Sequence, residues 1–202
     1  MSAATHDLLG LFRAFLKGRG ALVDGFAAAI ADAPAERPLE PSPLPCLEYL
    51  PRAAANAGGG AEALAQWLAR DAGELRWAQT YTEADFGRGF LDRYGWTELI
   101  GTRGHFASDT IAAGFLLLGP DVVYPDHHHV AEEIYVPLTP ATEWRKGDGG
   151  FVARAAGEVI HHPSNVSHAM RTGAEPLLAL YLWRGGPLAQ KSTVTGAAGQ
   201  GA

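Results

Sequence analysis

The chain has 202 residues, a length that fits one folded domain with an elaboration. Its 16 basic and 22 acidic residues give a net charge of −6 with neutral histidines, and they form no Lys/Arg run. This charge disfavours nucleic acids and anionic membrane surfaces as partners. The single cysteine, Cys46, excludes an intrachain disulfide and a zinc–thiolate cluster.

The first 95 residues are rich in Ala and Leu, and their apolar residues recur at three- and four-residue intervals. This spacing predicts helices over 8–16, 24–33 and 62–75. Six prolines between 34 and 51 predict an extended or turning segment between the second and third helices. We expect residues 1–95 to form a helical extension that packs on the following domain and helps to close one end of it. The segment shows neither a signal peptide nor a membrane span, which predicts a cytoplasmic protein.

From about residue 98 the sequence pattern changes to short segments, apolar or alternating apolar and polar, that are separated by Gly, Pro and Asp. Such spacing is typical of a small barrel or sandwich. We expect a mainly β domain over residues 96–190 and a flexible Gly/Ala-rich tail over 191–202. The predicted strands lie near 98–106, 112–118, 121–124, 132–138, 142–146, 151–154, 158–161, 167–172 and 177–183.

A dense group of chemically active side chains occupies residues 124–137, with the sequence YPDHHHVAEEIYVP. Side chains alternate faces along a strand, so His127 and His129 share one face and His128 points away. Glu133 has the same parity, and a barrel can bring His168 from a later strand beside them. We therefore predict a site for one divalent metal ion, held by His127, His129, Glu133 and His168. Imidazole and carboxylate ligands together suit borderline ions such as Zn, Fe, Mn, Ni or Co.

These residues resemble the two motifs of the cupin superfamily. His127-x-His129-x3-Glu133 fits the first motif, and Gly157-x5-Pro163 followed by His168 fits the second. The sequence departs from the usual pattern at turns, because Pro140 and Asn165 stand where glycines are common. Cupin motifs imply a small β-barrel and say little about the substrate.

Within the cupins, the sequence is most similar to the dimethylsulfoniopropionate (DMSP) lyases of the Q type, with the L, W and K types as near relatives. The similarity rests on Tyr124 before the histidines, Tyr135 two residues after Glu133, Trp183 late in the last strand and the helical extension. It implies cleavage of DMSP to dimethyl sulfide and acrylate.

The chemistry of that reaction suggests roles for these residues. Removal of the α-proton is the difficult step, and a tyrosine next to a cation can be the base because the cation favours the phenolate. We expect Tyr135 to be the base, with Tyr124 as alternate base or positioning residue. Aromatic faces attract the sulfonium, and Trp183 and Tyr124 are the candidates, with His127 also at the substrate.

Two other functions remain open from the sequence. The predicted ligands also suit another metal-dependent cupin enzyme, such as an iron dioxygenase or an isomerase. A cupin can alternatively serve as a metal or ligand sensor without catalysis, which an anti-sigma helical unit at the N-terminus would indicate. The sequence allows a monomer or a homodimer.

Overall fold

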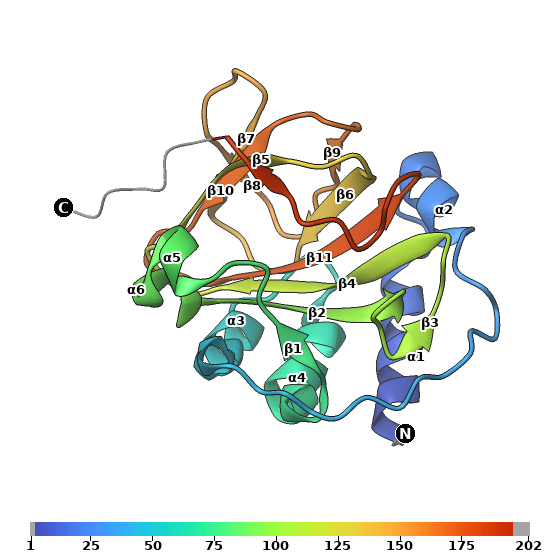
Figure 1. Ribbon diagram of the computed structural model, residues 1–202. Coiled ribbons are helices and arrows are strands. Elements are labelled where there is room, and N and C mark those ends of the chain that lie inside the picture. The colour runs from blue at the N-terminus through green and yellow to red at the C-terminus, as the bar shows by residue number, and fades with distance from the viewer. Residues whose placement is uncertain (1–2, 196–202) are drawn as a thin grey trace.

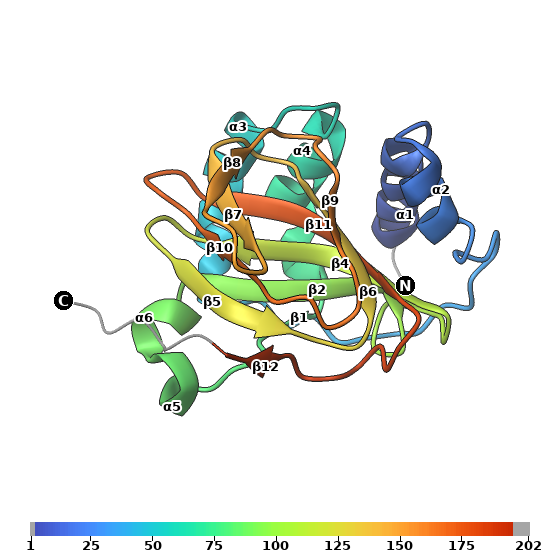
Figure 2. The ribbon, with the colours of Figure 1, turned by 90° about the horizontal axis from the view of Figure 1, so that it is seen from above.

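The computed structural model describes residues 3–195, which form two facing antiparallel sheets, and the helices within residues 3–71 pack on one of these sheets (Figures 1 and 2). The larger sheet has the order β1-β2-β4-β11-β6-β9, with β3 paired to β2. Its strands are β1 (Trp77–Ala78), β2 (Tyr94–Gly101), β3 (Phe106–Ala107), β4 (Ile111–Leu118), β6 (Glu132–Pro137), β9 (Ile160–His162) and β11 (Leu177–Arg184). The smaller sheet has the order β12-β5-β10-β7-β8. Its strands are β5 (Val123–His128), β7 (Thr142–Lys146), β8 (Val152–Arg154), β10 (His168–Arg171) and β12 (Thr193–Val194).

This arrangement confirms the prediction of a mainly β fold with helices toward the N-terminus. The helical elements are α1 (Ala3–Leu16), α2 (Ala21–Ala27), α3 (Leu50–Ala55), α4 (Glu62–Asp71), α5 (Glu83–Phe86), α6 (Arg88–Leu91) and two 3-10 turns, Pro45–Tyr49 and Ala72–Glu74. None of the helices over residues 3–195 has both the length and the apolar character needed to span a membrane.

Two predicted strands are shifted in the structure. The strand expected over 98–106 is β2 and ends at Gly101, whose φ of 148° starts a turn. The strand expected over 121–124 is β5 and continues through Pro125 to His128. Its pairing with β10 is irregular between the His127 and Tyr124 partners, and such a bulge accommodates a proline without a ladder hydrogen bond.

The Pro-rich segment turns, which agrees with the prediction, but it also enters a helix that was not expected. A 3-10 turn begins at Pro45, and α3 contains Pro51 as its second residue. Proline is compatible with the first turn of a helix because the N–H groups there have no intrahelical acceptor. In the same region, the helix expected over 24–33 is α2, which ends at Ala27.

Two groups of buried apolar side chains lie on opposite faces of the larger sheet. One joins the helices to the outer face of the sheet, with Phe12 of α1 against Phe115 of β4 at a ring distance of 5.8 Å. Figure 1 shows α1, α3 and α4 along this face. The other group fills the space between the sheets and contains Tyr94, Tyr124, Tyr135 and Trp144. Because both of its faces are covered, β4 is buried at every residue.

The C-terminal part of the chain contributes to the barrel before the described residues end. In β12, Thr193 pairs with His128 and Val194 with His127, both on β5. The predicted tail over 191–202 therefore begins within paired structure, and its residues 196–202 lie outside the described residues.

Gly114 allows β2 and β4 to approach closely. A Cβ atom at this position would lie 1.9 Å from the carbonyl oxygen of Thr97, a backbone atom in the next strand. We expect Gly114→Ala to lower the free energy of unfolding by about 2–3 kcal/mol or more, because strands must separate to admit the methyl group. Urea denaturation would measure the loss. Gly10→Ala is the matched control, since nothing lies within 4 Å of its Cβ position; an equal loss there would contradict the close-contact explanation.

Candidate metal centre and active site

Strand register brings the predicted site residues together on the inner face of the barrel. His127 of β5 pairs with His168 of β10. On β6, Glu133 pairs with Trp183 of β11 on one side and with His162 of β9 on the other. These contacts join residues that lie 29 to 50 positions apart in the sequence, so the site exists only once both sheets have formed.

Three of the four predicted metal ligands form a compact buried group. The potential ligand atoms of His129, Glu133 and His168 all lie within 4.8 Å of one another. His129 Nε2 is 3.0 Å and His168 Nε2 is 3.2 Å from the same oxygen, Glu133 Oε2. The Nδ1 atoms are engaged elsewhere, with His129 contacting the carbonyl of Ala131 and His168 that of Val166, each at 2.9 Å. These second contacts orient both rings so that Nε2 faces the carboxylate.

His127 lies beside this group. Its ring is 4.2 Å from that of His168 and stacks on Tyr124 at 4.2 Å. Its Nδ1 is 2.9 Å from the carbonyl oxygen of Pro125. Its role as the fourth ligand stays a prediction, because the structure places it next to the three clustered ligands but not among them.

The turn that leads to His168 explains one departure from the cupin pattern. Asn165 adopts φ of 60°, the left-handed conformation that glycine commonly takes and that asparagine tolerates. Its backbone N–H donates to the carbonyl of His129 at 2.9 Å. The substitution therefore preserves the turn and links the two motifs directly.

His161 and His162, which the sequence could not distinguish, have different surroundings. His161 is half-buried and contacts Glu132 at 2.8 Å. His162 is buried, stacks on His168 with a ring distance of 4.0 Å, and has Nδ1 3.8 Å from Glu133 Oε2. Burial lowers the pKa of His162 to about 4, so its imidazole is neutral at pH 7. Alternation along β9 was the only sequence signal for this difference.

The charge of the site is concentrated on Glu133. Burial acts to raise the pKa of its carboxyl, but His129 and the other imidazoles hold that pKa well below its ordinary value. In the same way, burial acts to lower the pKa of His129, and the Glu133 carboxylate raises it. The indole N–H of Trp183 donates to the other carboxylate oxygen, Oε1. Glu133 is therefore ionised and lies among imidazole and indole nitrogens. A carboxylate next to imidazole nitrogens is a set of ligands that suits a metal cation.

The two candidate tyrosines lie in the same cavity, which has a volume of about 280 Å³. Tyr135 is 6 % exposed, and burial together with the Glu133 carboxylate raises its pKa well above 10. Burial likewise raises the pKa of Tyr124, whose hydroxyl is 3.0 Å from that of Tyr81. Both phenols are therefore protonated at pH 7 unless a cation lies next to them.

Sequence reasoning missed most of the remaining cavity wall. Those lining residues come from the region between β1 and the turn after β2, from β11 and from the segment after it, and they include Gln79, Thr80, Tyr94, Trp96, Glu98, Arg103, Tyr181, Leu188, Gln190, Lys191 and Ser192. No motif marks them, because tertiary packing alone brings them to the site.

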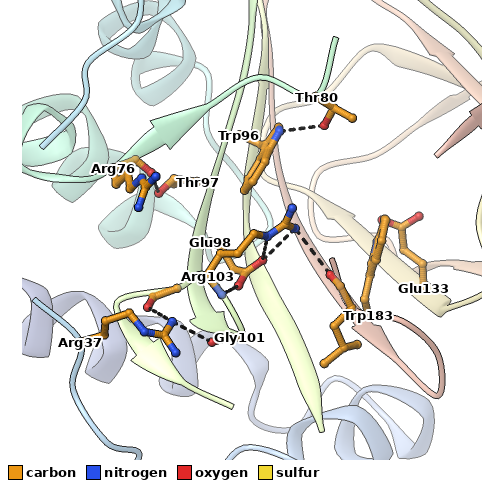
Figure 3. A network of polar contacts seen from close by, with 12 residues as sticks. Arg37, Arg76, Thr80, Trp96, Thr97, Glu98, Gly101, Arg103, Glu133 and Trp183 are labelled. Carbon is orange, nitrogen blue, oxygen red and sulfur yellow. Dashed lines mark hydrogen bonds and ion pairs between the residues drawn. The ribbon is translucent and has the colours of Figure 1, made fainter. Parts of the chain in front are cut away.

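One part of this wall is an ion pair between β2 and the turn that follows it (Figure 3). The Glu98 carboxylate is 3 % exposed and accepts from the backbone N–H of Arg103 at 2.6 Å and from its guanidinium at 3.1 Å. The guanidinium lies 4.6 Å from the ring of Trp96, whose indole N–H donates to Thr80. These contacts hold the turn in the wall of the cavity.

A two-sheet antiparallel barrel with a His/Glu group on its inner face defines a cupin-type protein, as predicted from the motifs. The family model of the dimethylsulfoniopropionate lyases, which describes the sequences of that family, matches residues 20–179. The chain is 34% identical over 187 residues to dimethylsulfoniopropionate lyase DddQ of Ruegeria pomeroyi, covering 90% of each chain. It is 29% identical over 165 residues to the putative dimethylsulfoniopropionate lyase DddL of Cereibacter sphaeroides, covering 80% of this chain and 68% of the relative.

Solved structures agree with these matches. The crystal structure of DMSP lyase DddQ from Ruegeria pomeroyi superposes with a TM-score of 0.86 at 31% identity, and a structure reported with the DMSP lyases RdDddP and RnDddQII gives 0.88 at 30%. Each comparison covers 96% of this chain and 98% of the other. The chain belongs to the dimethylsulfoniopropionate lyase family.

Proposed function

We propose that this protein cleaves DMSP to dimethyl sulfide and acrylate by β-elimination, with Tyr135 as the base. Family membership supports the substrate and the reaction. The observation that carries the role of Tyr135 is its position on β6, two residues beyond Glu133 and on the same face, in the cavity that also contains His127 and Trp183.

The donor group fits a divalent metal ion. Two imidazoles and one carboxylate converge within 4.8 Å, all three side chains are buried, and His168 Nε2 has no hydrogen-bond partner with suitable geometry among the described residues. We propose that His129, Glu133 and His168 hold one Zn, Fe, Mn, Ni or Co ion, with His127 as the fourth ligand. When bound, the ion would supply positive charge that favours the phenolate form of Tyr135 and stabilises negative charge on the substrate carboxylate.

The protein's own residues account for the rest of the proposed reaction. The phenolic oxygen of Tyr135 takes the α-proton, the Cα–Cβ double bond forms, and the Cβ–S bond breaks with its electrons going to sulfur. Dimethyl sulfide leaves as a neutral molecule, so this step requires no acid. The aromatic faces of Trp183 and Tyr124 attract the sulfonium by roughly 0.5–2 kcal/mol each.

The direct test is incubation of the purified protein with DMSP under anaerobic conditions, with each of the five metals added separately. We expect dimethyl sulfide in the headspace and an equal amount of acrylate in solution, because elimination consumes no oxygen. Absence of both products with every metal would refute the proposed reaction. Oxygen-dependent turnover would instead favour the dioxygenase alternative. The cytoplasmic location and the monomeric or dimeric state stay predictions.

A further inference from the structure

Tyr81 lies behind the wall of the cavity that contains Tyr124 and Tyr135. It is buried just before α5 and does not line the cavity itself. Its hydroxyl is 3.0 Å from the hydroxyl of Tyr124, which does line the cavity. At this distance one of the two hydroxyls donates a hydrogen bond to the other. Tyr81 is therefore linked to a candidate site residue without reaching the cavity.

The backbone around Tyr81 is held on both sides along the chain. Before it, the side-chain amide of Gln79 donates to the carbonyl of Leu91 at 2.6 Å. After it, Thr82 and Asp85 form a capping box at the start of α5, and the backbone N–H of Thr82 donates to the Asp85 carboxylate at 2.8 Å. Because these contacts already restrict the segment, the hydroxyl of Tyr81 reaches its partner at little further cost in conformational entropy.

The ring of Tyr124 is held between two neighbours. It stacks on the imidazole of His127 at 4.2 Å with 10° between the ring planes, and it meets the ring of Tyr81 edge-on at 5.7 Å. Stacking limits the tilt of an aromatic ring but allows it to slide parallel to its neighbour. The hydrogen bond at the hydroxyl end limits that sliding, so Tyr81 determines where the Tyr124 ring lies in the cavity wall.

We propose that Tyr81 is a positioning residue for the substrate and acts through Tyr124. The inference rests on the proposed function, in which the ring of Tyr124 attracts the sulfonium of DMSP. The two hydroxyls then act as one unit, because loss of either leaves the other without its partner. A ring held in place in advance binds the substrate without an ordering cost at that step.

A double-mutant cycle tests whether the two hydroxyls act together. It compares the full chain with Tyr81→Phe, Tyr124→Phe and the double variant, each supplied with metal. Phenylalanine keeps both rings, including the contact of ring 81 with Phe86 at 4.5 Å. We expect KM for DMSP to rise by about five- to tenfold in each single variant, with kcat changed by less than about twofold. The double variant should show no larger rise, because either substitution already breaks the pair.

A non-reactive probe separates this inference from the proposed reaction. Dimethylsulfonioacetate has the same carboxylate and sulfonium as DMSP but no β-carbon, so it cannot undergo elimination. Calorimetry gives its Kd for the same four proteins, and we expect the pattern found for KM. Absence of DMSP cleavage with normal probe binding would refute the reaction and still allow the cycle to be measured. Tyr49→Phe is the control, because it removes a hydroxyl outside the cavity lining and should change neither KM nor Kd.

A ¹³C label at Cζ of Tyr81 in the unmodified protein gives a measurement that does not depend on the folding of a variant. Since Tyr81 does not line the cavity, we expect its resonance to shift saturably with the probe only through its contact with Tyr124. The proposal is overturned if that resonance does not move, or if Tyr81→Phe leaves KM and Kd unchanged. Multiplied losses in the double variant, or a lower kcat at unchanged KM in Tyr81→Phe, would overturn it as well.

Discussion

Tyr135→Phe is expected to lower the rate of DMSP cleavage by about 10²–10⁴-fold, the usual contribution of a positioned general base. The substitution removes the phenolic oxygen and keeps the ring that packs against Trp144 at 5.0 Å. The fold and the donor group around Glu133 should therefore persist. Dimethyl sulfide release by gas chromatography measures the rate, and circular dichroism checks the fold.

Two further variants distinguish the base from other tyrosines. Tyr124→Phe removes the hydroxyl that contacts Tyr81, and Tyr49→Phe removes one outside the lining of the cavity. We expect a smaller loss of activity for Tyr124→Phe than for Tyr135→Phe, and none for Tyr49→Phe. If Tyr124→Phe were inactive and Tyr135→Phe active, the base would be Tyr124. Near-normal rates in both variants would exclude both tyrosines as the base.

Glu133→Gln is expected to weaken binding of the divalent metal ion by at least about 100-fold and to abolish DMSP cleavage. The carboxylate provides the only formal negative charge of the three clustered ligands, and both of its oxygens contact site residues, His129 and His168 at Oε2 and Trp183 at Oε1. The amide keeps the shape of the side chain but loses that charge. Elemental analysis of dialysed protein would give the metal content per chain.

Glu132→Gln is the matched control because the neighbouring carboxylate faces the other way and pairs with Arg184 and His161. We expect this variant to retain the metal. Removal of the metal from the unmodified protein by a chelator should stop the reaction, and re-addition should restore it. A fully active protein without metal would refute metal dependence. Equal metal content in Glu133→Gln and the unmodified protein would exclude Glu133 as a ligand.

Local spacing determined much of the candidate site in advance. The predicted barrel follows from short strands between turn residues, and the grouping of His129, Glu133 and His168 agrees with the spacing of the two cupin motifs. Alternation along one strand does not explain it, because His129 lies just after β5 and Glu133 lies on β6. The errors in the predicted strand boundaries lie where a turn signal in the local sequence conflicts with hydrogen-bonded pairing between strands. Pro125 reads as a turn in the sequence, but it lies within β5 because an irregular pairing with β10 accommodates it.

The sequence by itself determined the fold class, the family and the candidate ligands, because these depend on residue types at short, regular intervals. Only the tertiary structure decided which side chains surround them. The pairing of β6 with β11 and β9 places Trp183 and His162 on either side of Glu133, and the walls from β1–β2 and from the segment after β11 enclose the cavity. Such contacts depend on strand order and register, which arise from packing of the whole chain and leave no periodic signal in any one segment.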